Sequence, residues 1–321
     1  MTAPVAPSVA LVEAPTNLGL RPPAPGRAPG VAGMPARLRA LGLADRLHPE
    51  TEERVAAPNY HPARDPATGV RNAAAVAGYS RALADAVGRA LDAGRFPLVV
   101  GGDCTVLLGC VLALARRGAR TGSAGGRVGL AFLDGHQDLL TPASSPSGGA
   151  AGMDLALATG HGPPLLTTYD GVCPLVEPAD VVLLGYRDAD DVYGDPAVAP
   201  ARAAMCRLGL ATVRALGPAG AAARALAHWR ARGVDGVWVH LDADVLDAAV
   251  MPAVDDRQPG GLSYAELGAL LGPVLASGLA VGMAVTIYDP SLDPGGVAGA
   301  GLVDALVGLL RPASAAPRAY A

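Results

Sequence analysis

Lysine is missing from this sequence: all 25 basic residues among its 321 are arginine. A chain without lysine cannot supply a P-loop lysine, a Schiff-base lysine or an anchor for pyridoxal phosphate, so those enzyme classes are excluded. The formal net charge is -4 at pH 7, which disfavours binding to a phosphate backbone or to an anionic membrane surface. We therefore expect neither nucleic acid nor a membrane as a partner.

Cysteine is scarce, and long apolar runs are absent. Cys104, Cys110, Cys173 and Cys206 are widely spaced and form no C-x-x-C pair, which indicates reduced thiols rather than a disulfide framework. No apolar run is long enough to cross a bilayer, and residues 1–23 lack the basic and unbroken apolar regions of a secretory signal. These absences predict a soluble, cytoplasmic protein.

Hydrophobic residues make up 51% of the chain, which is ample for a sizeable core. Apolar runs typical of buried strands occur at 96–102, 127–135, 180–188, 236–244 and 279–290. Helical periodicity occurs at 73–94, 219–233, 262–278 and 301–310, and Ser263 with Glu266 forms a capping box. This alternation predicts an α/β fold with a parallel sheet covered on both faces. We expect one domain over 1–321, with 313–321 as a loose tail.

Acidic residues and one histidine follow two of the predicted strands. Asp134, His136 and Asp138 occupy alternate positions in DGHQD, and Asp242 and Asp244 do so in HLDAD. Residues two apart in an extended chain project to the same side. Because open α/β sheets bind ligands at the carboxyl ends of their strands, we expect the two clusters to converge.

Carboxylates brought together in this way repel one another and raise one another's pKa values unless cations neutralise them. Carboxylate oxygens with one imidazole suit Mn²⁺, with Fe²⁺ or Zn²⁺ as alternatives. The competing interpretation is structural, because Asp after a strand is often a helix cap or a turn residue. Two clusters with the same placement favour metal binding.

A third strand end carries Gly101, Gly102, Asp103 and Cys104, which alone are compatible with a nucleotide loop or with simple packing. The motifs GGDCT, DGHQD, SGGAAGMD, GYRDAD and HLDADVLDAAVMPAVDDRQPGGLS occur in the order and spacing of the arginase/agmatinase (ureohydrolase) family. The sequence resembles that family over most of its length. The resemblance implies a three-layer α/β/α domain with a mostly parallel eight-stranded sheet, a trimer or hexamer, and two Mn²⁺ ions at the strand ends.

The resemblance also implies roles for individual residues. Asp134 and Asp242 resemble carboxylates that bridge the two metals, His136 and Asp244 resemble ligands of one ion, and Asp138 resembles a ligand of the other. Asp138 and Asp244 are therefore our candidate catalytic residues as well. In the family a metal-bridging hydroxide attacks the guanidinium carbon and urea is released, since metals lower the pKa of water and hold it against a planar carbon.

Three positions depart from the family pattern. Cys104 replaces a histidine ligand, so it is a sixth ligand whose softness favours another ion, such as Zn²⁺ or Fe²⁺, or a single-metal site. Ala151 stands where the family has a proton-relay histidine. Ile287 stands where the family has the glutamate that pairs with the guanidinium, a loss of about 3 to 5 kcal/mol that disfavours arginine as the substrate.

Substrate contacts are assigned by position to Ser147 and Asp190. Asp154 is a further acid, which either supplies a replacement charge or caps the helical stretch that follows it, and we favour the cap. His240 shares the strand parity of Asp242 and Asp244, so we expect it to support those ligands rather than to bind metal.

These observations predict a Mn²⁺-dependent hydrolase that acts on a non-peptide C–N bond of a guanidino, amidino or small amide substrate. Two alternatives stay open. One is a degenerate family member that serves as a non-catalytic binding or regulatory protein, and the other is a single-metal amide deacetylase.

Overall fold

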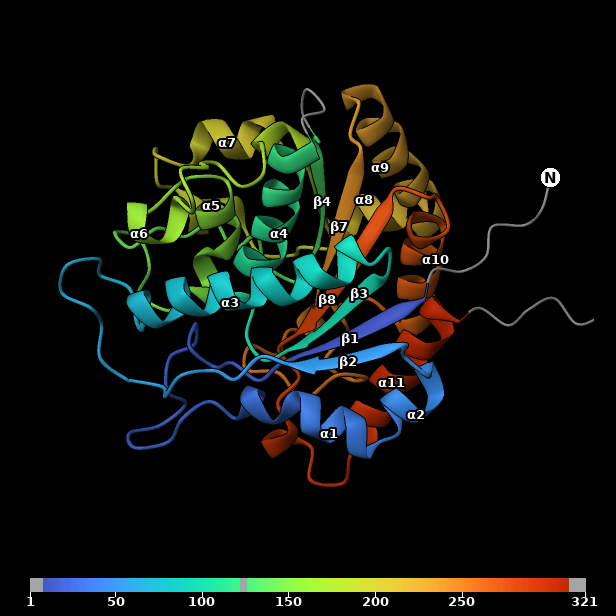
Figure 1. Cartoon of the computed structure of the whole chain (residues 1–321), viewed down its shortest axis with the longest axis horizontal. Helices are drawn as coiled ribbons and strands as arrows, with labels where there is room; N and C mark the ends of the chain where they lie inside the picture. The colour runs from blue at the N-terminus through green and yellow to red at the C-terminus, as the bar shows by residue number, and fades with distance from the viewer. Residues whose placement is uncertain (1–7, 122–125, 312–321) are drawn as a thin grey trace, which may run out of the picture.

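The computed structural model describes residues 8–121 and 126–311, so the expected loose tail, 313–321, lies outside the described residues. Eight strands form one sheet in the order β2-β1-β3-β8-β7-β4-β5-β6, and every pairing is parallel (Figure 1). The strands are β1 (Val9–Ala14), β2 (Thr51–Arg54), β3 (Phe96–Gly101), β4 (Val128–Leu133), β5 (Val181–Leu184), β6 (Cys206–Leu208), β7 (Gly236–Asp242) and β8 (Ala280–Thr286).

Helices cover both faces of the sheet. The α-helices are α1 (Met34–Ala40), α2 (Leu43–Leu47), α3 (Ala73–Asp92), α4 (Val106–Thr121), α5 (Asp154–Ala158), α6 (Pro164–Thr167), α7 (Ala199–Ala204), α8 (Leu210–Leu216), α9 (Pro218–Arg232), α10 (Tyr264–Leu275) and α11 (Val297–Leu310). Short 3₁₀ turns are η1 (Gly30–Gly33), η2 (Ala151–Met153), η3 (Pro178–Asp180), η4 (Asp190–Tyr193), η5 (Ala243–Val245) and η6 (Pro290–Leu292).

Two apolar cores separate these layers. One contains residues of α3, α4 and α5, and the other contains residues of α1, α2, α9, α10 and α11, on opposite sides of the sheet (Figure 1). In β4, Leu130 and Phe132 belong to the first core, whereas Ala131 and Leu133 belong to the second. Because central parallel strands are buried on both faces, they read as continuous apolar runs. The three-layer α/β/α architecture expected from the sequence is confirmed.

The predicted strands and helices are present, and the capping box on α10 is formed by Ser263 and Glu266. The strands are shorter than predicted, most of all β5 and β8, whereas α11 begins four residues earlier than predicted, at Val297. Strands β1, β2 and β6 were not predicted. Strand β2 reads TEER and is largely exposed, so it lacks an apolar pattern and is defined by its backbone pairing with β1. Strand β6 has only 3 residues, which is too short for a sequence pattern.

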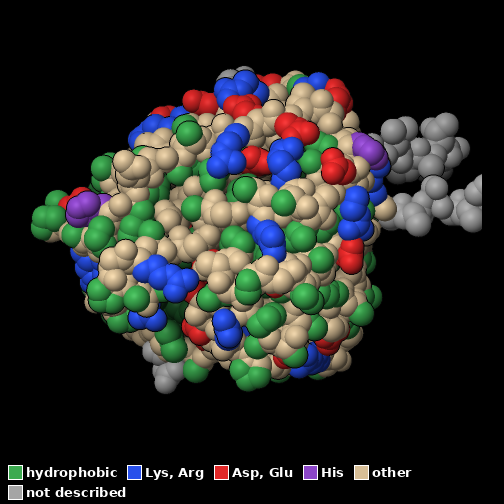
Figure 2. All heavy atoms as spheres, turned by 90° about the horizontal axis from the view of Figure 1, so that it is seen from below, with side chains coloured by type: hydrophobic (Ala, Val, Ile, Leu, Met, Phe, Trp, Pro, Cys, Tyr) green, Lys and Arg blue, Asp and Glu red, His purple; other side chains and the backbone are tan. Residues whose placement is uncertain are grey.

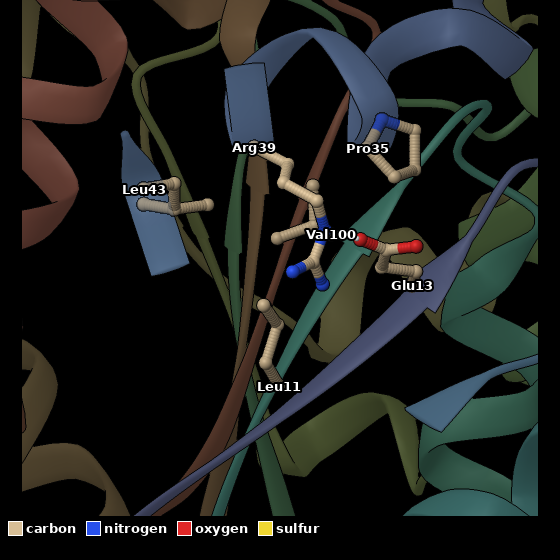
Figure 3. Close-up of a pocket in the computed structure, with 6 residues that line it drawn as sticks. All are labelled: Leu11, Glu13, Pro35, Arg39, Leu43 and Val100. Atoms are coloured by element: carbon tan, nitrogen blue, oxygen red, sulfur yellow. Dashed lines mark hydrogen bonds and ion pairs between the residues drawn. The ribbon is translucent and has the colours of Figure 1, made fainter. Parts of the chain in front are cut away.

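An ion pair ties α1 to the strands beneath it. Arg39 lies beside Glu13 (Figure 3), with its Nε 2.7 Å from Oε1 of the carboxylate. Arg54 Nη1 lies 3.1 Å from Oε2 of the same carboxylate. The Arg39 side chain lies in a small hollow whose wall includes Leu11 and Val100. Glu13 is buried, so the pair anchors α1 on the sheet. This hollow is separate from the acidic clusters.

Among the described residues, no helix is both long enough and apolar enough to cross a membrane. On the face shown in Figure 2, acidic and basic side chains lie beside one another and are interspersed with hydrophobic ones. This described face therefore has no continuous basic surface of the kind that binds a nucleic-acid backbone.

Candidate metal centre

The acidic clusters lie at the carboxyl ends of β4 and β7, which are neighbours among the four central strands β3, β8, β7 and β4. Leu133 of β4 pairs with Leu241 of β7, so Asp134 and Asp242 follow at neighbouring strand ends. Cys104 follows β3, which is separated from β7 only by β8. The parallel topology thus brings together residues that are far apart in the sequence.

The turn after β3 is fixed by a buried carboxylate and a close backbone approach. A Cβ added to Gly102 would lie 1.6 Å from the carbonyl oxygen of Thr16, so only glycine fits. Asp103 accepts hydrogen bonds from Thr16 Oγ1 at 3.0 Å and from the backbone N–H of Thr105 at 3.0 Å. These contacts hold Cys104, whose thiol donates to Asp242 Oδ2 at 2.7 Å.

The loop after β4 joins the loop after β7. The backbone N–H of His136 donates to Asp134 Oδ1 at 2.6 Å, and that of Gly135 donates to Asp244 Oδ1 at 2.9 Å. His136 Nδ1 lies 2.9 Å from Asp244 Oδ2, and Asp242 Oδ1 accepts from the backbone N–H of Asp244 at 2.8 Å. The backbone itself therefore orients three of the four acids that the sequence assigns as metal ligands.

Three groups of potential ligands occur in the described part of the chain, each with its ligand atoms within 4.8 Å of one another. They are Asp134–His136–Asp244, Cys104–Asp134–Asp242 and Cys104–Asp154–His240. The first two groups share Asp134, and the last two share Cys104. The three groups thus form a continuous row, and five of the six ligands predicted from the sequence lie in it.

The acids of this row are in an environment that disfavours negative charge. Burial, together with the charge of Asp244, raises the pKa of Asp134 to about 7, and burial with the charges of Asp244 and Asp134 raises the pKa of Asp242. Burial and the charge of Asp242 also raise the pKa of the Cys104 thiol. Asp134 Oδ2 is buried and has no hydrogen-bond partner among the described residues. A divalent cation would satisfy this oxygen and stabilise the ionised ligands, so these residues fit a metal site.

His136 is held by polar groups on both sides of its ring. Burial lowers its pKa, but hydrogen bonds with Asp134, Asp244 and Asp256 outweigh burial and raise it. Nε2 lies 3.2 Å from Asp256 Oδ2 and 2.7 Å from Gln258 Nε2. The sequence analysis did not assign Asp256 or Gln258, although both lie within the motif that contains Asp242 and Asp244.

Asp138 is the predicted ligand that belongs to none of the three groups among the described residues. Its side chain is buried, and its backbone is in the left-handed region with φ 46°. Burial raises the pKa of Asp138, and the charges of Asp134 and Asp154 raise it further. Asp138 therefore lies in the same electrostatic environment, and its role as a ligand and catalytic residue stays a prediction.

The residues predicted to contact substrate lie in different environments. Ser147 is half-buried and its Oγ accepts the backbone N–H of Gly149 at 3.0 Å. Asp190 is an exposed carboxylate that forms an ion pair with Arg207 and accepts from Gln137 Nε2 at 3.2 Å. Asp154 is fully buried at the start of α5, where it makes no capping hydrogen bond. Its Oδ2 lies 3.8 Å from Nε2 of the buried His240. Its roles as a cap of α5 and as a replacement charge both stay predictions.

Apolar residues occupy the two positions at which the family resemblance implies that a functional side chain is missing. Ala151 is buried in η2, and its N–H donates to Gly19 O at 3.1 Å. Ile287 is 3% exposed and has φ 72°, a strained value for a β-branched residue. Its N–H donates to Gly102 O at 2.8 Å. Neither residue can relay a proton or pair with a cation.

Arg187, in the loop after β5, connects the backbone at Asp244 to the backbone at Gln258. Its Nη2 donates to Asp244 O at 2.7 Å and to Gln258 O at 3.1 Å, and it reaches Leu246 O at 3.4 Å. One guanidinium therefore binds carbonyls on both sides of residues 247–257.

Residues 8–308 match the family model described as the arginase family. The chain belongs to the arginase family. It is 33% identical to the arginase of Bacillus caldovelox over 226 residues, which are 70% of this chain and 67% of that protein. It is 37% identical to the arginase of Brevibacillus brevis over 189 residues, 57% of this chain and 58% of that protein. The native structure of the B. caldovelox arginase superimposes with a TM-score of 0.83 at 27% identity, covering 95% of this chain and 98% of that one. Membership of the arginase family supports metal-dependent hydrolysis of C–N bonds as the chemistry of this fold.

Proposed function

We propose that this arginase-family protein is a Mn²⁺-dependent hydrolase of a non-peptide C–N bond in a guanidino, amidino or small amide compound other than arginine. The observation that carries the proposal is the convergence of Asp134, His136, Asp242 and Asp244 at the ends of two adjacent strands. Two Mn²⁺ ions are expected, held by these residues with Asp138 and Cys104. When bound, such ions lower the pKa of water and polarise the C–N carbon of the substrate.

The residues of the chain would contribute positioning and charge. Asp134 belongs to both ligand groups and would be shared by the two metal positions. Asp242, whose Oδ2 accepts from the Cys104 thiol, is the second proposed shared ligand, as the family resemblance implies. Asp244 is fixed by the N–H of Gly135, which leaves its carboxylate little freedom to rotate. Asp138 and Asp244 are the proposed catalytic residues, and Ser147 and Asp190 the proposed substrate contacts.

The proposal of a substrate other than arginine is supported by the carboxylates and side chains available to a guanidinium. Ile287 offers no carboxylate to a guanidinium, and the carboxylate of Asp190 is already paired with Arg207. Asp154 is buried completely and cannot reach a substrate that enters from solvent. We therefore propose the C–N bond hydrolysis of the arginase family for this chain, with a different substrate because Ile287 offers no carboxylate.

The proposal is tested on full-length protein purified without chelator. Metal content is measured, and guanidino, amidino and acylamino compounds are screened with Mn²⁺ for release of urea, ammonia or amine, with Asp242→Ala as the control. We expect two Mn²⁺ ions per chain and turnover of a compound other than arginine, which the variant loses. One ion per chain, with turnover of acylamino compounds in Zn²⁺ or Fe²⁺, would establish the deacetylase instead. Neither metal nor turnover would establish a non-catalytic binding or regulatory protein.

We also propose that the protein forms a single domain and acts as a cytoplasmic trimer or hexamer. The inclusion of all described strands in one sheet supports the single domain. Light scattering coupled to size-exclusion chromatography measures the oligomer directly, and a monomer at micromolar concentration would refute the assembly.

A further inference from the structure

A further group of potential metal ligands adjoins the groups that contain Asp134. It consists of Cys104, Asp154 and His240, which come from the turn after β3, the start of α5 and the middle of β7. Asp154 and His240 are 0% exposed, and Cys104 is 2% exposed. The ligand atoms of all three lie within 4.8 Å of one another. None of these side chains can reach solvent, so the cluster is not a surface group of acids.

Two of its members lack the hydrogen bonds that buried polar groups require. Both ring nitrogens of His240 and both carboxylate oxygens of Asp154 have no hydrogen-bond partner among the described residues. His240 Nε2 and Asp154 Oδ2 face each other at 3.8 Å, which is too long for a hydrogen bond. Buried polar side chains in folded proteins nearly always have partners. These four atoms therefore indicate a partner that binds between them.

The imidazole is held in place for such a partner. Its ring stacks on Phe132 of the neighbouring strand, with ring centroids 5.0 Å apart and an interplanar angle of 18°. An unprotonated nitrogen of this ring carries the lone pair that a metal ligand needs. The stacking fixes the plane of the ring, and thereby the direction of that lone pair.

The three residues offer three different ligand atoms. Cys104 provides a sulfur, His240 a nitrogen and Asp154 an oxygen, and these atoms meet in one buried place. A set of one sulfur, one nitrogen and one oxygen is the chemistry of Zn²⁺ and of its substitute Co²⁺, and not that of Mn²⁺.

We propose that Cys104, Asp154 and His240 form an inner metal position for Zn²⁺ or Co²⁺, adjoining the proposed manganese pair and joined to it through Cys104. The spacing agrees with this assignment. Zinc bonds of about 2.0 to 2.2 Å that meet at a tetrahedral angle place nitrogen and oxygen about 3.4 Å apart, so the observed 3.8 Å requires only a small movement. The inner position extends the proposed function, but its test does not depend on turnover.

The test is a Co²⁺ titration of metal-depleted, full-length protein under reducing conditions without oxygen. Cobalt bound to a thiolate absorbs in the near ultraviolet by charge transfer, so the absorption reports the Cys104–metal bond. We expect this absorption in the wild type and its loss in Cys104→Ser. His240→Gln and Asp154→Asn should weaken the binding that produces it by at least about ten-fold, the effect of losing even an outer partner of a metal ligand.

Asp244→Asn is the matched control, because Asp244 belongs only to the group that contains His136. This variant should keep the absorption and its midpoint while it loses the outer ion. Absorption that is unchanged in His240→Gln and Asp154→Asn but lost in Asp242→Asn would overturn the inner position, since Cys104 would then bind metal only beside Asp242. Absence of the absorption from the wild type would overturn it as well.

A second measurement on the wild type covers the case in which the buried variants do not fold. X-ray absorption at the zinc edge of protein loaded with one Zn²⁺ should show a sulfur at about 2.3 Å together with imidazole nitrogen at about 2.0 Å. A shell of oxygen atoms alone would refute the proposal. Failure of the manganese hydrolase would instead appear as absent turnover with an intact zinc–sulfur signal, so the two proposals fail separately.

Discussion

Asp134 is the acid whose removal tests most directly whether buried repulsion governs the site. Burial and the charge of Asp244 raise its pKa from 3.8 to about 7, so the folded, metal-free protein favours the neutral carboxyl group. The folded protein is therefore most stable with Asp134 protonated. The stability that depends on this proton is fully present below pH 4 and is lost as the pH rises through 7. The difference between the two pKa values, at about 1.4 kcal/mol for each pH unit, amounts to about 4 kcal/mol.

Asp134→Asn replaces this carboxyl group by an amide that is neutral at every pH. Between pH 4 and 8, the free energy of unfolding of the metal-free wild type should therefore fall by about 4 kcal/mol more than that of the variant. Urea unfolding followed by circular dichroism, on chelator-treated protein, measures both. An equal pH dependence of the two proteins would refute the reasoning, since Asp134 would then carry no unfavourable charge. Excess Mn²⁺ should remove the difference for a metal-binding wild type.

Three further predictions concern the pocket, the turn after β3 and α10. Ile287→Glu should raise kcat/KM for arginine at least about 100-fold, because a buried carboxylate–cation pair is worth about 3 to 5 kcal/mol; unchanged urea release would contradict the role of this position. Gly102→Ala should lower the free energy of unfolding by about 1 to 3 kcal/mol, measured by thermal unfolding, because the added Cβ would lie 1.6 Å from Thr16 O. Gly88→Ala is the control and should not destabilise the protein, because no atom lies within 4 Å of the Cβ added there. Ser263→Ala should lower the free energy of unfolding by about 1 kcal/mol, because it removes the side-chain cap of α10. A denaturation midpoint equal to that of the wild type would contradict a stabilising role of this cap.

The central sheet could be predicted because its strands are buried on both faces and therefore appear as uninterrupted apolar runs. The candidate ligands followed from the same pattern, since Asp134 and Asp242 stand where two such runs end. Strand β2 could not be predicted, because its exposed TEER segment is defined only by hydrogen bonds to a strand about 40 residues earlier.

The burial of individual side chains within the site could not be predicted from the sequence either. Strand parity places His240 on the same side as Asp242, but parity does not reveal how far a side chain lies from solvent or what packs above it. The contact between His240 and Asp154 depends on the path of residues 134–154 over the sheet. Likewise, Asp256 and Gln258 reach His136 through a loop that has no periodic pattern. Such contacts are tertiary, and a local pattern contains no information about them.

The guanidinium of Arg187 has a consequence for how molecules enter and leave. Because it bonds to the carbonyls of both Asp244 and Gln258, the segment over His136 and the strand end that holds the acids behave as one mechanical unit. Swinging that segment outward would break bonds that also position Asp244. Entry and exit of small molecules past residues 247–257 are therefore coupled to the position of Asp244.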